Sequence, residues 1–347
     1  MHSLERVRNV IAGKPVDRLP AQPMIMMLAA KYLGVSFLDY TRDGRLMAAG
    51  QLKIARDFDI DCLLTCSDPA REVVDIAGEE SIEWLLDQGP VIIEERAALR
   101  DPARLRQLRV PDPMGGGRMH DRVKAIEIML RETRGEKSIV GWVEGPLALG
   151  AELRGLNRIM TDFVDDPAFV DDLLEFTAEV ALCYAEAQIQ AGADTIGMSD
   201  AAASMMGPRH YARFLFPRQQ RVFAEIKRRH PEILTRQHIC GQTGLILDKM
   251  KELAVDIYEL DFPVDLAKAK PILGRRVISG NVSTVTTLLR GTPEDVYEAA
   301  GQCHSVCGRQ FIVGSGCEVS PLTPLENVRA LVSYAQDHVS IPGPREN

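Results

Sequence analysis

The chain has 347 residues, of which 46% are hydrophobic and 26% charged, and its formal net charge is −8. This composition supports a sizeable folded core and excludes a disordered chain. The acidic balance also argues against a nucleic-acid surface, because the basic clusters at 227–229 and 275–276 are too short to outweigh it.

The N-terminal segment and the cysteines indicate the cellular compartment. The segment MHSLERVRNVIAGKP has charges scattered through it, and no later segment offers about 18 uncharged apolar residues in a row. Seven cysteines are an odd number and do not form the dense framework of a small secreted domain. We therefore expect a cytoplasmic protein without membrane contact, whose cysteines are reduced or bind a metal.

Short apolar runs rich in β-formers recur along the chain, each followed by a longer helical stretch, which is typical of βα units on a parallel sheet. The runs predicted as strands are residues 22–27, 62–67, 139–145, 194–199, 233–240, 257–261, 277–281 and 311–317. Stretches such as 169–191 and 293–306 have the apolar spacing of crossover helices. Eight such units predict a single (β/α)8 TIM barrel across residues 1–347, in the α/β class.

Two segments depart from this repeat. Residues 2–13 are predicted as a helix before the barrel, which ends at Gly13 and Pro15. Residues 70–135 are too long for one connection, and they contain a predicted hairpin at 81–95 with its turn at Gln88-Gly89-Pro90. We expect residues 70–135 to be an insertion over the barrel mouth and not a second domain.

The most informative residues for chemistry are His238 and Cys240, at the end of one predicted strand. Side chains alternate along a strand, so these two point to the same face and could offer a nitrogen and a sulfur to one metal. Cys317 ends the last predicted strand, and the carboxyl ends of all barrel strands meet at one mouth. A His/Cys/Cys set leaves one tetrahedral position of zinc open, as catalytic sites do. A second interpretation stays open, because cysteines are often buried as small hydrophobic residues and His-x-Cys is a short motif.

Other polar residues near predicted strand ends are candidates for contact with a substrate. They are Glu144, Asp200, Asp261, Asn281 and Asp68. Such side chains can orient ligands or hydrogen-bond to metal-binding residues.

Several segments resemble the uroporphyrinogen decarboxylase superfamily, and more narrowly its zinc-dependent corrinoid methyltransferase branch. They are HICG, DIYELDFPVDL, ISGNV, GTPEDV and GSGCEVSPLTPLENVRAL, and the likeness covers nearly the whole chain. The resemblance implies Zn²⁺ bound by His238, Cys240 and Cys317, which would form the catalytic centre. It also implies methylcobalamin, carried by a corrinoid-binding protein, as co-substrate, together with a small thiol or methylated substrate.

Two alternatives remain at this point. Uroporphyrinogen decarboxylases hold porphyrinogen carboxylates with two arginines in a motif of the form MRQAGRYL, where this chain has Met27, Leu28 and Lys31. The bidentate recognition of carboxylates is therefore missing, although a decarboxylase-like acid persists as Asp68. In the other alternative, zinc only ties the barrel together and the chain is a non-catalytic docking partner of a corrinoid protein. The sequence leaves open both the direction of transfer and the identity of the substrate.

Overall fold

Seven parallel strands form the centre of the protein in a computed structural model, which describes residues 1–66 and 68–338. Along the sheet the strands follow one another in chain order, and each pairs in parallel with the next. They are β1 (Cys62–Leu64), β4 (Ser138–Glu144), β5 (Thr195–Ser199), β6 (Leu234–Ile239), β7 (Ile257–Leu260), β8 (Val277–Gly280) and β9 (Phe311–Ile312).

Residues 20–22 fill the gap between β9 and β1. On one side the Val313 N–H donates to Pro20 O at 2.9 Å, and the Gln22 N–H donates to Val313 O at 2.8 Å. On the other side the Asp61 N–H donates to Ala21 O at 2.9 Å. These bonds close the curled sheet, so the predicted barrel fold is confirmed.

The strand predicted at 22–27 is wrong. A single parallel bridge at Ala21 takes its place, and helix α2 (Met27–Leu33) begins where the strand was expected to end. The physical reason is that Pro20 and Pro23 have no N–H to donate to a ladder, which limits regular pairing to the residues between them. The other seven predicted strands are observed: β4 is shifted by one residue, and the other six are shorter than predicted. Ser67, the predicted end of one of them, lies outside the described residues.

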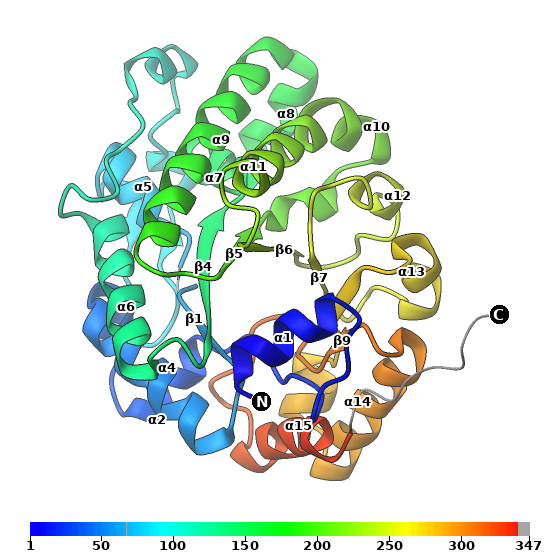
Figure 1. The fold of residues 1–347 in the computed structure, drawn as a ribbon. Helices are drawn as coiled ribbons and strands as arrows, with labels where there is room; N and C mark the ends of the chain where they lie inside the picture. The colour runs from blue at the N-terminus through cyan, green and yellow to red at the C-terminus, as the bar shows by residue number, and fades with distance from the viewer. Residues whose placement is uncertain (67, 339–347) are drawn as a thin grey trace.

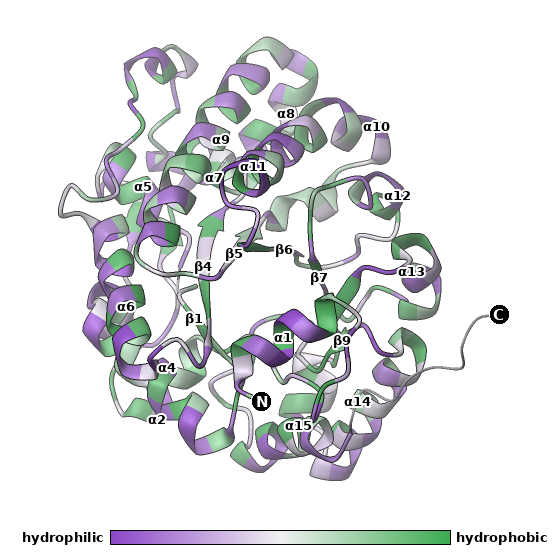
Figure 2. Ribbon diagram, viewed as in Figure 1, coloured by the Kyte–Doolittle hydropathy of each residue, from purple (hydrophilic) through white to green (hydrophobic). Residues whose placement is uncertain are grey.

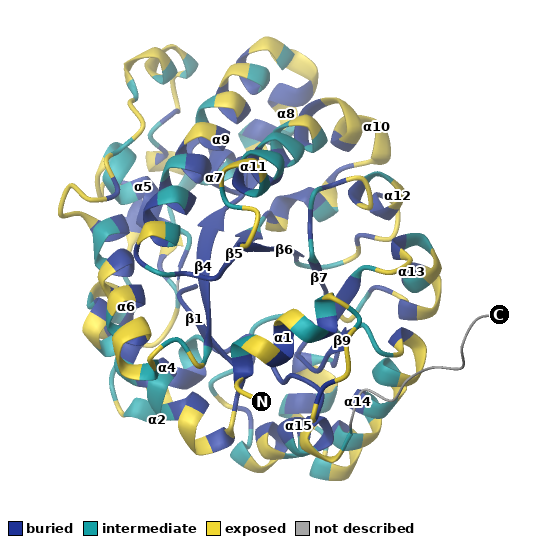
Figure 3. Ribbon diagram, viewed as in Figure 1, coloured by how far each residue is buried: buried dark blue, intermediate teal, exposed yellow. Residues whose placement is uncertain are grey.

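Helices surround the strands (Figure 1). The long ones are α4 (Gly44–Phe58), α6 (Arg118–Thr133), α9 (Pro167–Gln190), α11 (Phe216–Arg229), α14 (Pro293–Cys307) and α15 (Leu325–Asp337). The helices predicted at 169–191 and 293–306 are therefore confirmed. Figure 2 shows hydrophilic residues on the outer helix faces, and Figure 3 shows the strands buried inside the ring. In the described part of the chain, no helix combines the length and apolarity needed to cross a bilayer.

Shorter elements connect these units. The short α-helices are α3 (Phe37–Arg42), α5 (Ala70–Ala77), α7 (Pro146–Arg154), α8 (Leu156–Asp165), α10 (Pro208–His210), α12 (Leu247–Met250) and α13 (Leu266–Leu273). The 3-10 helices are η1 (Glu94–Arg96), η2 (Pro102–Gln107) and η3 (Ala201–Met205), and the π-helical turns are η4 (Tyr211–Leu215) and η5 (Thr284–Leu289). The predicted hairpin is present as antiparallel β2 (Ile82–Glu83) and β3 (Val91–Ile92). Within residues 70–135, α6 packs against α4 and β4 as a crossover helix does.

Helix α1 (Ser3–Ile11) covers the amino-terminal end of the barrel, opposite the mouth. Val7 and Val10 on this helix are buried against residues of four strands: Leu234, Ile257 and Val277, which begin β6, β7 and β8, and Ile312 of β9. In Figure 1 the helix lies in front of the strands. The predicted helix at 2–13 is confirmed, and this end of the barrel is sealed by apolar packing.

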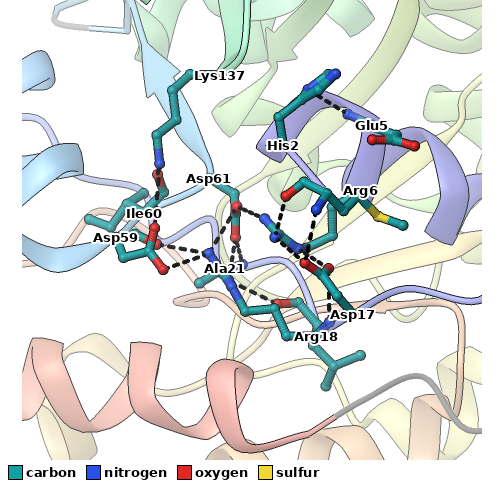
Figure 4. Close-up of polar contacts among 12 residues, drawn as sticks. His2, Glu5, Arg6, Asp17, Arg18, Ala21, Asp59, Ile60, Asp61 and Lys137 are labelled. Carbon is teal, nitrogen blue, oxygen red and sulfur yellow. Dashed lines mark hydrogen bonds and ion pairs between the residues drawn. The ribbon is translucent and has the colours of Figure 1, made fainter.

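Ion pairs hold α1 in place (Figure 4). Arg6 pairs with Asp61 at 2.6 Å and with Asp17 at 2.8 Å. Arg18 pairs with the other oxygen of Asp61 at 2.7 Å and with Asp59 at 2.9 Å. The Asp61 side chain has no exposed surface, so both of its oxygens are satisfied by charges from outside the strands. The network ties the N-terminal segment to the start of β1.

Candidate metal centre

His238, Cys240 and Cys317 lie together at the barrel mouth. Nε2 of His238 is 3.2 Å from the sulfur of Cys240 and 3.8 Å from the sulfur of Cys317. The two sulfurs are 3.6 Å apart. His238 comes from β6, Cys240 directly follows that strand, and Cys317 follows β9, so the barrel brings together residues that are 77 positions apart.

These separations fit the edges of a zinc coordination tetrahedron. With Zn–S near 2.3 Å and Zn–N near 2.0–2.1 Å, a tetrahedral ion would hold two sulfurs about 3.8 Å apart and a sulfur and a nitrogen about 3.6 Å apart. The three ligand atoms lie within 4.8 Å of one another. One soft nitrogen and two soft sulfur donors in this arrangement suit zinc.

The backbone around the two cysteines is fixed by Asp261, which follows β7. Its Oδ2 accepts the Gly241 N–H at 2.6 Å, and its Oδ1 accepts the Phe262 N–H at 2.7 Å. Gly241 has a φ of +83°, a conformation that side-chain-bearing residues rarely adopt. Gly316 is equally constrained, because a Cβ there would lie 2.6 Å from the Phe262 nitrogen. Glycines beside both cysteines therefore let three loops approach closely.

Two carboxylates near the cluster are engaged elsewhere. Asp261 accepts the two backbone bonds described above, and Oε1 of Glu318 accepts the Met27 N–H at 2.8 Å. Among the residues that the structure describes, the group capable of holding a metal has three members. The arrangement supplies three of the four donors of a tetrahedral site.

The two thiols are strongly coupled. A hydrogen bond from Cys240, together with the neighbouring His238, lowers the pKa of Cys317 to about 4. The hydrogen bond that Cys240 donates to Cys317, together with burial, raises the pKa of Cys240. A thiolate at this position is the form of cysteine that binds metals.

A buried ion pair behind His238 was missed by the sequence analysis. Nδ1 of His238 is 3.5 Å from Oε2 of Glu259, its register partner on β7. Glu259 pairs in turn with Arg236, whose Nε lies 3.1 Å from Oε2, and both side chains are buried. The available signal was the presence of a charged residue, Arg236 or Glu259, in the interior of each of two predicted strands. Nδ1 therefore lies on the side of the carboxylate, without a hydrogen bond to it, while Nε2 lies on the side of the sulfurs.

The remaining predicted pocket residues lie at strand ends, yet mostly bond to the protein. Glu144 ends β4 and pairs with Arg71 at 3.2 Å, and burial raises its pKa to about 8. Asn281 follows β8, and its Nδ2 donates to the carbonyls of Asp261 and Val264. These contacts hold the loops in place, and a substrate-binding role for these two residues stays a prediction.

Asp200 and Asp68 are buried more deeply. Asp200 accepts the Ala148 N–H and the Gln219 Nε2–H, each at 2.8 Å, and its own N–H donates to His238 O. Burial raises the pKa of Asp200 to about 7. Asp68 pairs with Arg118 at 2.9 Å, and its side chain has no exposed surface. The structure thus brings together the three predicted metal ligands, while contact of Asp200 or Asp68 with a substrate remains untested.

A cavity of about 380 Å³ lies beside the cluster, between α7, η3 and the end of the hairpin. Ser204 of η3 lines it, and the same serine packs against Gly241, the residue after Cys240. Cavities of this size hold small organic ligands.

The fold is a parallel β/α barrel, and one nitrogen and two sulfurs converge at its mouth. These two features place the protein in the class of barrel proteins with a candidate catalytic metal site at the mouth. Comparison with protein families gives a more specific assignment. The family model for uroporphyrinogen decarboxylase (URO-D) matches residues 2–338, and the chain belongs to this family.

Individual relatives come from both branches of the predicted resemblance. The chain is 29% identical over 344 residues to a methylcobamide:CoM methyltransferase of Methanosarcina barkeri, covering 96% of this chain and 97% of the relative. It is 31% identical over 249 residues to a uroporphyrinogen decarboxylase of Prochlorococcus marinus, covering 69% and 70%. A solved methyltransferase structure from Methanosarcina mazei superposes with a TM-score of 0.82 at 24% identity, over 97% of this chain and 99% of the other. That structural likeness concerns the fold alone. The family match and the relatives named here confirm the predicted resemblance to the uroporphyrinogen decarboxylase superfamily and its methyltransferase branch.

Proposed function

We propose that this protein is a zinc-dependent methyltransferase that moves a methyl group between a corrinoid on a partner protein and a small thiol or methylated substrate. The observation that carries the proposal is the spacing of 3.2, 3.6 and 3.8 Å among the atoms of His238, Cys240 and Cys317. The similarity to methylcobamide:CoM methyltransferases over nearly the full chain supports a corrinoid-dependent enzyme.

The residues around the site have separable tasks. His238, Cys240 and Cys317 would hold the metal, and Asp261 fixes the loops that carry the two sulfurs. Zinc bound in this way would lower the pKa of a substrate thiol in its open position and keep that thiol nucleophilic at neutral pH. Glu259 would keep the imidazole in the tautomer that directs Nε2 at the metal.

The rim of the mouth suits a protein partner. Large apolar side chains are exposed on the loops after five successive strands, one from each: Met205, Leu245, Phe262, Val285 and Leu322. An exposed apolar ring of this kind is typical of protein-binding surfaces. It supports docking of a corrinoid-bearing protein, which would bring its methyl group over the metal.

The decarboxylase alternative has less support. Asp68 is buried, pairs with Arg118 and caps α5 by accepting the Ala70 N–H at 3.1 Å. It is therefore not presented to the mouth as an acid that could meet a porphyrinogen. Met27 and Lys31 also stand where the decarboxylases have their arginines, which removes the recognition of carboxylates.

The test combines metal analysis with turnover. Purified protein should contain about one zinc per chain, and it should demethylate methylcobalamin in the presence of a thiol, with loss of activity under a chelator. Cys240→Ser and Cys317→Ser should lose both the zinc and the activity, while Cys183→Ser, remote from the cluster, should keep both.

Two results would contradict the proposal. A metal-free protein that releases carbon dioxide from uroporphyrinogen would establish the decarboxylase instead. A zinc-loaded protein that binds a corrinoid protein without transferring a methyl group to or from any substrate would establish the non-catalytic alternative.

A further inference from the structure

The cavity beside the metal centre has apolar walls. Seven of its eleven lining residues have apolar side chains, among them Ile92, Leu156 and Met205, and the other four of the seven are alanines. The walls come from three parts of the chain that meet at the mouth: the hairpin end, α7 and η3. Small alanine side chains on two of the three walls create the space. The cavity therefore suits a short hydrocarbon chain.

The cavity is also connected mechanically to the metal centre. Asp200 bonds to the backbone of Ala148 in one wall, and its own N–H donates to the carbonyl of His238. Ser204 in another wall lies against Gly241. Two walls of the cavity thus contact the segments that carry His238 and Cys240, which places the cavity near the cluster.

The charged groups in the lining are both acidic. Glu94 and Glu152 line the cavity, and no Lys, Arg or His stands among its lining residues. Glu94 accepts a hydrogen bond from Asn157 at 2.9 Å. Oε2 of Glu152 is buried and has no hydrogen-bond partner among the described residues. An unpaired buried acceptor is costly, and Glu152 also lines the cavity, so its carboxyl group is the one in this lining that would gain most from a donor.

The surroundings of Glu152 determine the charge of that ligand. Burial raises the pKa of Glu152 well above its ordinary value, and the neighbouring Glu144 and Glu72 carboxylates raise it further. Negative charge is already unfavourable here, so a sulfonate or carboxylate ligand would add repulsion. A positive group would offset this repulsion and donate to the Glu152 carboxyl group.

We infer that this cavity binds the non-reacting end of the small substrate, and that this end is an alkylammonium group that donates to Glu152. The assignment to the substrate rests on the proposed function. It separates this protein from a methyltransferase whose thiol carries a sulfonate, because the cavity lacks a cation to hold such a group.

The experiment uses three probes of equal chain length and different charge: n-butylammonium, 1-butanol and butane-1-sulfonate. Calorimetric titration of the full-length protein measures the affinity for each. The n-butylammonium probe should bind more tightly than the other two, and Glu152→Gln should weaken it about tenfold or more. Glu298→Gln, which changes an exposed acid on α14, is the matched control and should leave the affinity unchanged.

A second variant tests the location. Ala151→Leu keeps both acids and fills the cavity, so it should abolish n-butylammonium binding. Equal or tighter binding of butane-1-sulfonate, or unchanged affinity in Glu152→Gln or Ala151→Leu, would overturn the inference.

The same preparations separate this inference from the proposed function. A zinc-loaded protein that transfers methyl groups but fails to bind n-butylammonium contradicts the cavity assignment alone. A protein that binds n-butylammonium through Glu152 but holds no zinc contradicts the proposed function, and it supports the cavity as a site for organic cations.

Discussion

At the scale of single residues, the metal centre depends on a charge inside the barrel. Glu259 and Arg236 form a buried pair, and Glu259 also approaches Nδ1 of His238. A buried pair contributes little net stability, but loss of one partner leaves the other charge uncompensated. The same glutamate therefore affects both folding and the orientation of the imidazole.

Glu259→Gln should lower two quantities, the stability of the fold and the affinity for zinc, whereas an ordinary core substitution should lower only the first. Because Arg236 would lose its partner, the free energy of unfolding should fall by about 3–5 kcal/mol. Because the imidazole would lose its orienting carboxylate, zinc affinity should fall by about 10–100-fold. Urea unfolding and zinc competition with a chromophoric chelator measure the two quantities.

The control removes both charges. In the double variant Arg236→Met, Glu259→Leu, no buried charge is left unpaired, so most of the stability should return. Zinc affinity should stay low, since Nδ1 still lacks its partner. If affinity recovered together with stability, Glu259 would act through the fold alone.

Gly316→Ala tests the close approach of the loops. A methyl group there would meet the Phe262 nitrogen at 2.6 Å, so the loop that carries Cys317 has to move. We expect zinc affinity to fall at least about tenfold, because a ligand displaced from its position loses much of its bond to the metal. Gly89→Ala, in the hairpin turn with no atom within 4 Å of the added methyl, is the matched control. Equal zinc affinities in the two variants would contradict this prediction.

The convergence of the three candidate metal ligands was predictable for a simple reason, and their surroundings were not. Strand alternation and the common mouth of a barrel suffice to join His238, Cys240 and Cys317. The contact between His238 and Glu259 depends on the register of β6 and β7, which the sequence does not specify. The pairing of Asp68 with Arg118 joins residues 50 positions apart through the packing of α6. Strand alternation gives the direction of a side chain, but the residue that this side chain contacts depends on tertiary packing.

At the scale of elements, helix α1 closes the amino-terminal end of the barrel. The helix itself and its end shortly before Gly13 were predictable from the sequence, as were the long helices α9 and α14. The segment at 22–27 was predicted wrongly as a strand. A run of six residues has too little periodicity to indicate its structure, and here two prolines decide it. Short elements are decided by local chemistry, whereas long helices follow from their pattern.

The ion pairs of α1 should make part of the stability depend on pH (Figure 4). The hydrogen bond from Arg6 holds the pKa of the Asp17 carboxyl well below its ordinary value. A carboxyl whose pKa is lower in the folded state stabilises that state above its unfolded pKa, near 4, and loses this effect as pH falls further. Asp17→Asn should therefore reduce the free energy of unfolding at pH 7, by about 1 kcal/mol or less because the side chain is 44% exposed.

Urea unfolding between pH 7 and pH 2.5 measures this dependence. The difference between the wild type and Asp17→Asn should shrink as pH falls below about 4, and it should also shrink in 1 M NaCl, where the Debye length is about 3 Å. A difference that stays constant across both series would assign the effect of Asp17 to packing and not to its charge.

At the scale of the whole molecule, the barrel has two ends with different tasks. The amino-terminal end carries α1, its apolar seal and its ion pairs, while the mouth carries the sulfurs, the imidazole and the cavity. Because the two ends are built from different residues, the loops at the mouth can vary without loss of the fold. Substitutions at the two ends should therefore act independently.

Val10→Ala and Cys240→Ser test this independence. Val10 is buried against the strand starts, so its truncation should lower the free energy of unfolding by about 1–3 kcal/mol, equally with zinc or with a chelator. Under the proposed function, zinc that binds the folded state alone should, at a thousandfold excess over its dissociation constant, add about 4 kcal/mol to the wild type and to Val10→Ala. Cys240→Ser should lose that increment. Calorimetric unfolding of the double variant should give the sum of the single effects within about 0.5 kcal/mol. Weaker zinc binding by Val10→Ala would instead mean that the seal of the barrel sets the geometry of its mouth, 230 residues further along the chain.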